Sequence, residues 1–263
     1  MVSINPVPTE QELLAFYAQD YYAYQPLQKA GMESLLSSKL KRLLTRKIVT
    51  HNPRFENPGE FLDVGCGSGD YLHLMRAKGW SVRGVEPSSF GALEGSRAGL
   101  DIFNGTILEA NFASDSFDYV RANHSVEHMP NPVEVLSEFY RIVKPGGKVF
   151  VGVPNTESLP YRLFGKYWFH LTVPLHVYAY GVSSISALLR QTGFKVQEVH
   201  FNSDYLSLLG SLQIVFNRNS NNRSSQGKLM RSRLLKVIAT ATERLVDLVG
   251  QGDAIEVIAE KPL

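Results

Sequence analysis

The chain has 263 residues, of which 44% are hydrophobic and 20% are charged, a composition typical of a globular protein with one large core. Its 27 basic and 25 acidic residues leave a net charge of +2, which argues neither for nor against nucleic acid as a partner. The single cysteine excludes a disulfide framework within the chain.

The N-terminal residues contain no basic stretch followed by an apolar core, so we expect no signal peptide. No apolar run approaches the ~20 residues that a membrane-spanning helix needs. The sequence therefore predicts a cytoplasmic protein. A peripheral contact with the inner face of the membrane is a further expectation, based on a basic helix near the C-terminus that is described below.

Residues 1–50 are expected to form an aromatic and helical cover. Residues 1–25 are rich in aromatic rings, which suit either a cover over a binding site or a seal at one end of the core. Residues 29–49 carry leucines at helical spacing and a basic second face. That face is either simply solvated or in contact with an anionic substrate or membrane surface. The aromatic residues are Phe16, Tyr17, Tyr21, Tyr22 and Tyr24.

Residues 61–72 predict a buried strand, a glycine turn and the start of a helix. Gly65, Gly67 and Gly69 allow backbone angles that other residues avoid and let a ligand approach the main chain closely. The helix start presents free N–H groups and a partial positive charge. Such a turn suits the carboxylate end of an amino-acid-like cofactor, and the alternative is a tight turn without a ligand.

The spacing of these glycines separates two classes of cofactor. Nicotinamide sites carry G-x-G-x-x-G, whereas residues 63–69 read D-x-G-x-G-x-G. This pattern resembles motif I of the class I S-adenosylmethionine-dependent methyltransferases. The resemblance implies S-adenosyl-L-methionine as the cofactor, with Asp63 holding its amino group directly or through water. Cys66 is expected to be a small residue that fits between the glycines, not a nucleophile. The predicted cofactor-binding residues are Asp63, Gly65, Cys66, Gly67, Gly69, Glu86, Pro87 and Asn123.

Glu86 ends the next predicted strand, residues 81–87, roughly 20 residues beyond the glycine turn. Dinucleotide-binding folds place a ribose-binding acid at this distance, because a carboxylate there can accept hydrogen bonds from both ribose hydroxyls. The alternative is a surface glutamate.

Strand and helix signals alternate from residue 60 to residue 155. Helices are expected over 70–79, 90–99 and from Pro132, and strands over 102–106, 116–122 and 148–155. Such alternation predicts parallel strands with helices on both faces. The stretches "FDYVRANHSVEHMPNP" and "IVKPGGKVFVGVPN" again resemble the methyltransferases, closest to the small-molecule branch with quinone and sugar O-methyltransferases. The resemblance implies a Rossmann-like sheet of seven strands, mostly parallel, with an antiparallel last strand.

The rest of the chain completes what we expect to be one structural domain. The core, residues 51–203, includes an irregular aromatic segment, 156–180, that resembles the family's cover over the substrate opening; we call it the lid. Residues 204–250 form an inserted block with an apolar part, 205–216, and an amphipathic helix, 228–249. Residues 251–263 supply the last strand of the core.

The inserted helix carries basic residues where its own dipole disfavours them by ~0.3–1 kcal/mol each. These are Lys228, Arg231, Arg233 and Lys236. The apolar face of the helix either packs on the domain's own surface or, with residues 205–216, rests on an anionic membrane surface or a lipid-linked substrate.

Histidines are the candidates for a base that removes a hydroxyl proton. His176, on the lid, is the first choice, and His124, after the fourth strand, is the second. His128 is expected to bond its loop to the following helix. No metal site is predicted, because the chain has no H-E-x-x-H motif, no cysteine pair and no acidic cluster at ligand spacing.

The sequence thus predicts an S-adenosylmethionine-dependent methyltransferase that acts on a hydroxyl of a small-molecule, sugar or lipid-linked acceptor. Nucleic acid is not expected as the acceptor. Enzymes that methylate amino groups of DNA bases carry a Pro-Pro-aromatic pattern after the fourth strand, whereas residues 123–126 at this place read N-H-S-V. Two alternatives stay open: a nicotinamide-dependent oxidoreductase, and a non-catalytic cofactor-binding protein with the same fold. The sequence predicts no oligomeric state.

Overall fold

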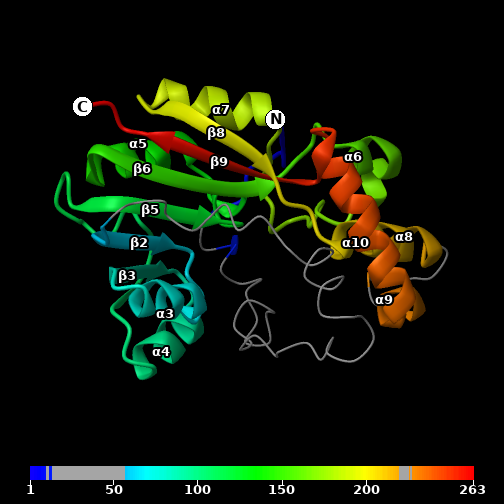
Figure 1. Ribbon diagram of the computed structural model, residues 1–263, viewed down its shortest axis with the longest axis horizontal. Coiled ribbons are helices and arrows are strands. Elements are labelled where there is room, and N and C mark those ends of the chain that lie inside the picture. The colour runs from blue at the N-terminus through cyan, green and yellow to red at the C-terminus, as the bar shows by residue number, and fades with distance from the viewer. Residues whose placement is uncertain (10–11, 14–56, 219–224, 226) are drawn as a thin grey trace.

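A computed structural model describes residues 1–9, 12–13, 57–218, 225 and 227–263. Its centre is a seven-stranded sheet with the order β4-β3-β2-β5-β6-β9-β8 (Figure 1). The expected helix over 29–49 and the aromatic rings at 16–24 lie outside the described residues. The strands are β2 (Glu60–Val64), β3 (Ser81–Glu86), β4 (Ile102–Asn104), β5 (Phe117–Asn123), β6 (Val143–Pro154), β8 (Lys195–Phe201) and β9 (Ala254–Glu260).

Strand direction follows the expected pattern. The pairs from β4 across to β6 are parallel, whereas β9 is antiparallel to both of its neighbours, β6 and β8. The last strand therefore enters the sheet between two strands that precede it in the chain. The predicted Rossmann-like, mostly parallel sheet with an antiparallel last strand is confirmed.

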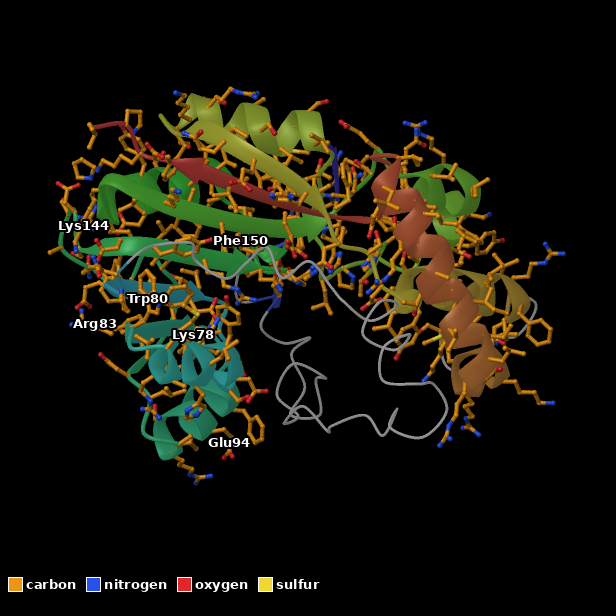
Figure 2. All side chains as sticks on the ribbon, in the orientation of Figure 1. Lys78, Trp80, Arg83, Glu94, Lys144 and Phe150 are labelled. Atoms are coloured by element: carbon orange, nitrogen blue, oxygen red, sulfur yellow. The ribbon has the colours of Figure 1, made fainter. Side chains whose placement is uncertain are left out.

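Helices cover both faces of this sheet, which explains why its central strands are continuous apolar runs. On one face, α5 (Pro132–Ile142) and α7 (Val182–Gln191) bury Leu136, Phe139 and Leu189 against the strands. On the other face, α3 (Asp70–Ala77) packs against a cluster that includes Trp80 and Phe150, both labelled in Figure 2. The next helix, α4 (Ser89–Arg97), lies beside β3 and β4.

The lid is more regular than the sequence indicates. It contains α6 (Leu159–Phe164), a 3-10 helix (Gly165–Tyr167) and the short strand β7 (Tyr178–Ala179), which pairs with β1 (Val2–Ser3). Ser158 caps α6 by accepting a hydrogen bond from the Tyr161 N–H group. The prediction that residues 156–180 are irregular is therefore wrong for the first half of this segment, where Ser158 caps the start of α6.

One buried carboxylate fixes the lid to the sheet. Asp253, which directly precedes β9, accepts hydrogen bonds from Trp168 Nε1 at 2.8 Å and from Ser158 Oγ at 2.6 Å. Trp168 is only 1% exposed. The lid is thus held at the start of β9 by the hydrogen bond from the Trp168 indole to Asp253.

The described part of the inserted block forms three helices, α8 (Tyr205–Phe216), α9 (Lys228–Arg231) and α10 (Arg233–Leu248), with α8 and α10 side by side (Figure 1). The single helix expected over 228–249 is wrong, because the chain leaves helical geometry at Ser232. The Oγ of Ser232 accepts a hydrogen bond from the Leu235 N–H group and so starts α10 afresh.

The inner face of α10 buries an acid. Glu243 is 1% exposed, and burial, together with Asp253, Asp247 and Asp204, raises the pKa of its carboxyl group to about 8. Asp253 shares this environment, and burial raises its pKa to about 6. The native protein therefore holds protons here that an unfolded chain would release.

This proton binding predicts a pH-dependent stability. Because the Glu243 pKa lies above its ordinary value of 4.5, the contribution of this group is complete below that value and is lost as the pH rises toward 8. The variant Glu243→Gln, which stays neutral, should lose less thermal stability than the wild type between about pH 5 and about pH 8. Thermal unfolding at both pH values measures this, with the exposed Glu134→Gln on α5 as the matched control. Equal pH slopes for wild type and Glu243→Gln would contradict the assignment.

Candidate functional site

The glycine turn between β2 and α3 adopts the backbone geometry that its sequence requires. Gly65, Gly67 and Gly69 have φ values of 76°, 56° and 86°, in the left-handed region that side chains disfavour. The Gly65 and Cys66 N–H groups donate to the carbonyl of Val85 at 2.8 and 3.2 Å. The turn is therefore tied to the end of β3, where the second predicted cofactor contact lies.

Glu86 ends β3 and faces the glycine turn. Its Oε2 accepts the Gly67 N–H group at 2.8 Å, and its Oε1 accepts the Ser88 N–H group at 2.9 Å. It is 5% exposed, which excludes the alternative of a surface glutamate. Burial raises the pKa of Glu86, and the two backbone hydrogen bonds oppose that rise. Each oxygen keeps a further lone pair, so the carboxylate can still accept hydroxyl groups.

Asp63 has a partner that the sequence did not reveal. It lies directly opposite Arg121 on the neighbouring strand β5, and Arg121 Nη1 is 2.8 and 2.9 Å from its two carboxylate oxygens. The guanidinium group of Arg121 lies over the Tyr71 ring at 3.9 Å. Asp63 is 1% exposed, so this is a buried ion pair. Its contact with the cofactor's amino group stays a prediction.

The remaining predicted cofactor residues surround the same turn. Gly69 is the N-cap of α3 and offers no side chain to its first N–H groups, which leaves them suited to a carboxylate. Burial raises the pKa of the Cys66 thiol, and the negative charges of Asp63 and Glu86 raise it further. A thiol with a raised pKa is a poor nucleophile. Pro87 follows Glu86, and Asn123 ends β5 opposite Gly152.

The packing of the protein itself requires two of these glycines. A Cβ atom at Gly65 would lie 2.6 Å from Ser125 Cβ, and one at Gly69 would lie 2.2 Å from Leu100 Cδ1. Packing and backbone angle therefore both demand glycine here, which keeps the main chain bare beside Glu86. The carboxylate of Glu86 and the uncapped N–H groups at the start of α3 are suited to the hydroxyl and carboxylate groups of S-adenosylmethionine, and its binding at this turn stays a prediction.

A histidine–glutamate pair follows β5. His124 has a φ of 53°, uncommon for a residue with a side chain, and its N–H group donates to the Gly152 carbonyl at 2.8 Å. Its Nδ1 lies 3.3 Å from Oε1 of Glu127, which is fully buried. Burial opposes the charge of His124, but the hydrogen bond and charge of Glu127 raise its pKa. Burial also disfavours the charged form of Glu127 and so acts to raise its pKa. The hydrogen bond from His124 and the charges of the neighbouring histidines outweigh burial and lower this pKa to about 2.

Two histidines of the lid, His170 and His176, contact histidines of the loop after β5. The His124 and His170 rings are stacked with centroids 6.4 Å apart, and the His128 and His176 rings meet edge-on at 4.7 Å. Burial lowers the pKa of His170 to about 3 and that of His176 to about 4, so both imidazoles are neutral near pH 7.

His128 differs from its expected role. Its Nδ1 lies 2.9 Å from the Leu175 carbonyl of the lid, so this hydrogen bond joins the loop after β5 to the lid and not to the following helix. The structure therefore brings the two predicted candidates for the base, His124 and His176, to the same edge. It adds Glu127 and His170 to them.

Comparison with known proteins identifies the family. Residues 30–199 match the model of a methyltransferase domain family. The chain belongs to the S-adenosylmethionine-dependent methyltransferases. This confirms the predicted family, enzyme class and cofactor, and nothing in the comparisons supports a nicotinamide-dependent oxidoreductase.

Curated relatives match about two fifths of this methyltransferase. A ubiquinone biosynthesis O-methyltransferase of Pseudomonas entomophila (strain L48) is 34% identical over 109 residues, which are 39% of this chain and 47% of that protein. A demethylmenaquinone methyltransferase of Lysinibacillus sphaericus (strain C3-41) is 31% identical over 123 residues, 43% of this chain and 53% of that protein. The chain thus spans about half the length of the curated relatives it matches.

Solved structures share the fold of this methyltransferase over most of its length. An S-adenosylmethionine-dependent methyltransferase from Archaeoglobus fulgidus aligns with a TM-score of 0.56 at 20% identity, covering 85% of this chain and 93% of that one. A putative methyltransferase of Haloferax volcanii, in complex with its Trm112 activator, aligns with a TM-score of 0.57 at 18% identity, covering 85% and 89%. These likenesses show the fold alone.

The glycine turn makes a direct prediction about cofactor affinity. A methyl group at Gly67, as in Gly67→Ala, should lower S-adenosylmethionine affinity at least about tenfold, because it stands where a ligand approaches the main chain. Calorimetric titration measures this. The matched control is Gly99→Ala, which introduces the same strain at a φ of 77° with nothing within 4 Å of the added carbon. Equal affinity in wild type and Gly67→Ala would mean that the cofactor binds elsewhere.

Proposed function

We propose that this methyltransferase transfers a methyl group to a hydroxyl of a small-molecule, sugar or lipid-linked acceptor. The observation that carries the proposal is the His124–Glu127 pair, which directly follows β5 and adjoins the glycine turn. Ser125, between the two residues of this pair, donates its hydroxyl to the Val64 carbonyl at 2.9 Å. A potential base and the predicted cofactor turn thus belong to one packed unit.

The cofactor half of the site needs little chemistry from the protein. When bound, S-adenosylmethionine supplies a methyl group on a positively charged sulfur, already activated for displacement. Gly65, Gly67, Gly69 and Glu86 would hold it at the carboxyl ends of β2 and β3, where ligands bind in open parallel sheets. The chain's main contribution is then to align the acceptor oxygen.

A hydroxyl acceptor must also lose a proton, and we propose that His124 takes it. Its Nδ1 is directed at the Glu127 carboxylate, which leaves Nε2 to accept the proton and places a negative charge where the imidazolium forms. No carboxylate of the described residues is hydrogen-bonded to His176, the first choice from the sequence. His176 would then line the acceptor side of the site.

The acceptor class finds support in the relatives, whose names specify ubiquinone biosynthesis and demethylmenaquinone. Both names indicate ring-containing small molecules. A partly apolar acceptor also suits an edge where the half-buried Phe169 of the lid packs against His170.

Turnover with hydroxyl acceptors tests this function. The protein, given S-adenosylmethionine and either a catechol with an apolar tail or a nucleotide-linked sugar, should release S-adenosylhomocysteine and a methyl ether, both measured by mass spectrometry. His124→Asn, chosen because asparagine tolerates positive φ, should lower kcat by about 10²–10⁴-fold while cofactor affinity is kept.

The control for this experiment is His200→Asn on β8, which should turn over at the wild-type rate. Near-normal turnover of His124→Asn would remove His124 from the mechanism, and the same assay on His176→Asn then tests the other candidate. Cofactor binding without turnover on any hydroxyl would favour the alternative of a non-catalytic cofactor-binding protein.

We further propose that the inserted block, residues 205–249, rests on an anionic membrane surface or a lipid-linked acceptor. Much of the apolar face of α10 is exposed: Leu234 is 69%, Leu245 65% and Leu248 81% exposed. Its opposite face buries Ala239 and Glu243. Basic Arg231 and Arg233 are exposed at the start of this apolar face. No helix in the described ranges is long and apolar enough to cross a membrane.

Co-sedimentation with lipid vesicles tests this contact. Wild type should pellet with vesicles that contain an anionic phospholipid, and less at high salt, which screens the attraction. Arg231→Gln combined with Arg233→Gln should reduce the bound fraction. The matched control is Arg83→Gln on β3 with Arg97→Gln on α4, two elements on the opposite side of the molecule from α10 (Figure 1). Wild type that stays in the supernatant would leave the exposed face as packing or a contact between copies.

A further inference from the structure

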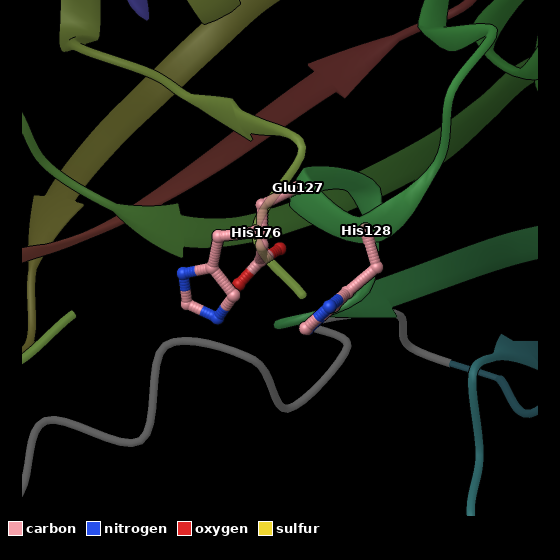
Figure 3. A group of neighbouring side chains, drawn as sticks. All are labelled: Glu127, His128 and His176. Atoms are coloured by element: carbon pink, nitrogen blue, oxygen red, sulfur yellow. The ribbon is translucent and has the colours of Figure 1, made fainter. Parts of the chain in front are cut away.

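The loop after β5 and the lid together form a set of metal ligands. We propose that Glu127, His128 and His176 bind one divalent transition-metal ion, zinc being the best match. One ligand atom from each of the three residues lies within 4.8 Å of the other two. Figure 3 shows the two imidazoles on either side of the carboxylate. The site does not depend on the proposed methyl transfer.

Glu127 is the residue that most needs such a partner. Its side chain is fully buried, and only Oε1 has a hydrogen-bond partner, His124. In the described part of the chain, Oε2 is buried without one. A buried carboxylate oxygen without a partner is costly, and a cation beside it would remove that cost.

His128 is oriented as a metal ligand. Its Nδ1 lies 2.9 Å from the Leu175 carbonyl, so Nδ1 carries the proton and Nε2 is the ring nitrogen that would bind the metal. Metal-binding histidines commonly donate their other ring nitrogen to a carbonyl in this way. Because Leu175 directly precedes His176, the same hydrogen bond holds the second imidazole beside the first.

The donor set selects among metals. Two imidazoles and one carboxylate form the three-residue set of many zinc sites, with a fourth position left for water or substrate. Magnesium prefers oxygen ligands only, so two imidazoles disfavour it. Zinc–ligand bonds of about 2.1 Å would bring the three atoms to about 3.4 Å from one another, so a pair now 4.8 Å apart would close by about 1.4 Å.

The ion would have a structural role and a chemical role on the acceptor side of the site. It would join the loop after β5 to the lid, and its fourth position could take an acceptor oxygen, lowering the pKa of a bound hydroxyl group. This role, unlike the binding itself, rests on the proposed function.

Zinc binding to the untagged protein, freed of metal by chelation, tests the site without cofactor or acceptor. Equilibrium dialysis with elemental analysis should find one equivalent of Zn²⁺, and calorimetry should give its affinity. Glu127→Gln and His176→Asn should each weaken binding at least about 100-fold. The control His200→Asn, which removes a histidine from β8, should bind as wild type does. Cobalt in place of zinc should give visible absorption bands in wild type that both site variants lose.

Three results would overturn the proposal: no zinc bound by wild type, equal affinity in wild type and His176→Asn, or binding of Mg²⁺ in preference to Zn²⁺. Circular dichroism and cofactor titration establish that each variant is folded. His176→Asn changes only the lid, so it tests the site even where Glu127→Gln disturbs the buried loop. Wild type that binds zinc but methylates no hydroxyl acceptor would count against the proposed function and not against the metal site.

Discussion

Burial of one carboxylate constrains the sheet edge under the lid, where we propose that the acceptor binds. Glu127 lies in the loop after β5, is fully buried and is ionised. A charge removed from water must be met by partners within a few ångströms. Those partners are His124 and His128 on its own loop, together with the neutral imidazole of His176 from the lid. The position of the lid over the sheet edge is therefore linked electrostatically to a single acid.

The cofactor edge depends on a second buried charge, one that strand pairing provides. Parallel pairing of β2 with β5 sets Asp63 opposite Arg121, and Tyr71 at the start of α3 stacks on the guanidinium group. This arrangement holds the end of β2, where the glycine turn starts, against the strand that carries His124. The two halves of the site are thus joined through the centre of the sheet and not through loops alone.

The alternating fold was predictable from the sequence because its signals are local. The glycine turn, the proline that opens α5 and the apolar runs of the strands each lie within a short window, and the structure confirms the elements between residues 60 and 155. The break at Ser232 was not predictable in the same way, since the apolar pattern continues across it. A serine can cap a new helix without interrupting that pattern.

The site was predictable from the sequence only where its residues are recognised by their spacing along the chain. Glu86 and the glycines follow from spacing, whereas the pairing of Asp63 with Arg121 depends on which strands become neighbours. The approach of His176 to Glu127 and His128 depends on how the lid folds back. Aromatic composition alone does not reveal that path, because it is set by Trp168 reaching Asp253 beyond the inserted block.

That anchor divides the methyltransferase into two parts that can diverge separately. The residues predicted to bind the cofactor come from the chain up to Asn123. The acceptor wall is fastened through Asp253 to β9, the last strand in sequence, which lies on the other side of β6 from the glycine turn. The inserted block contacts the lid, because Ser211 Oγ on α8 accepts a hydrogen bond from the Phe169 N–H group. If the lid borders the acceptor as we propose, variation in the inserted block would change the acceptor side while leaving the cofactor half intact. A lineage of such enzymes could exchange acceptors by altering one contiguous stretch of its gene.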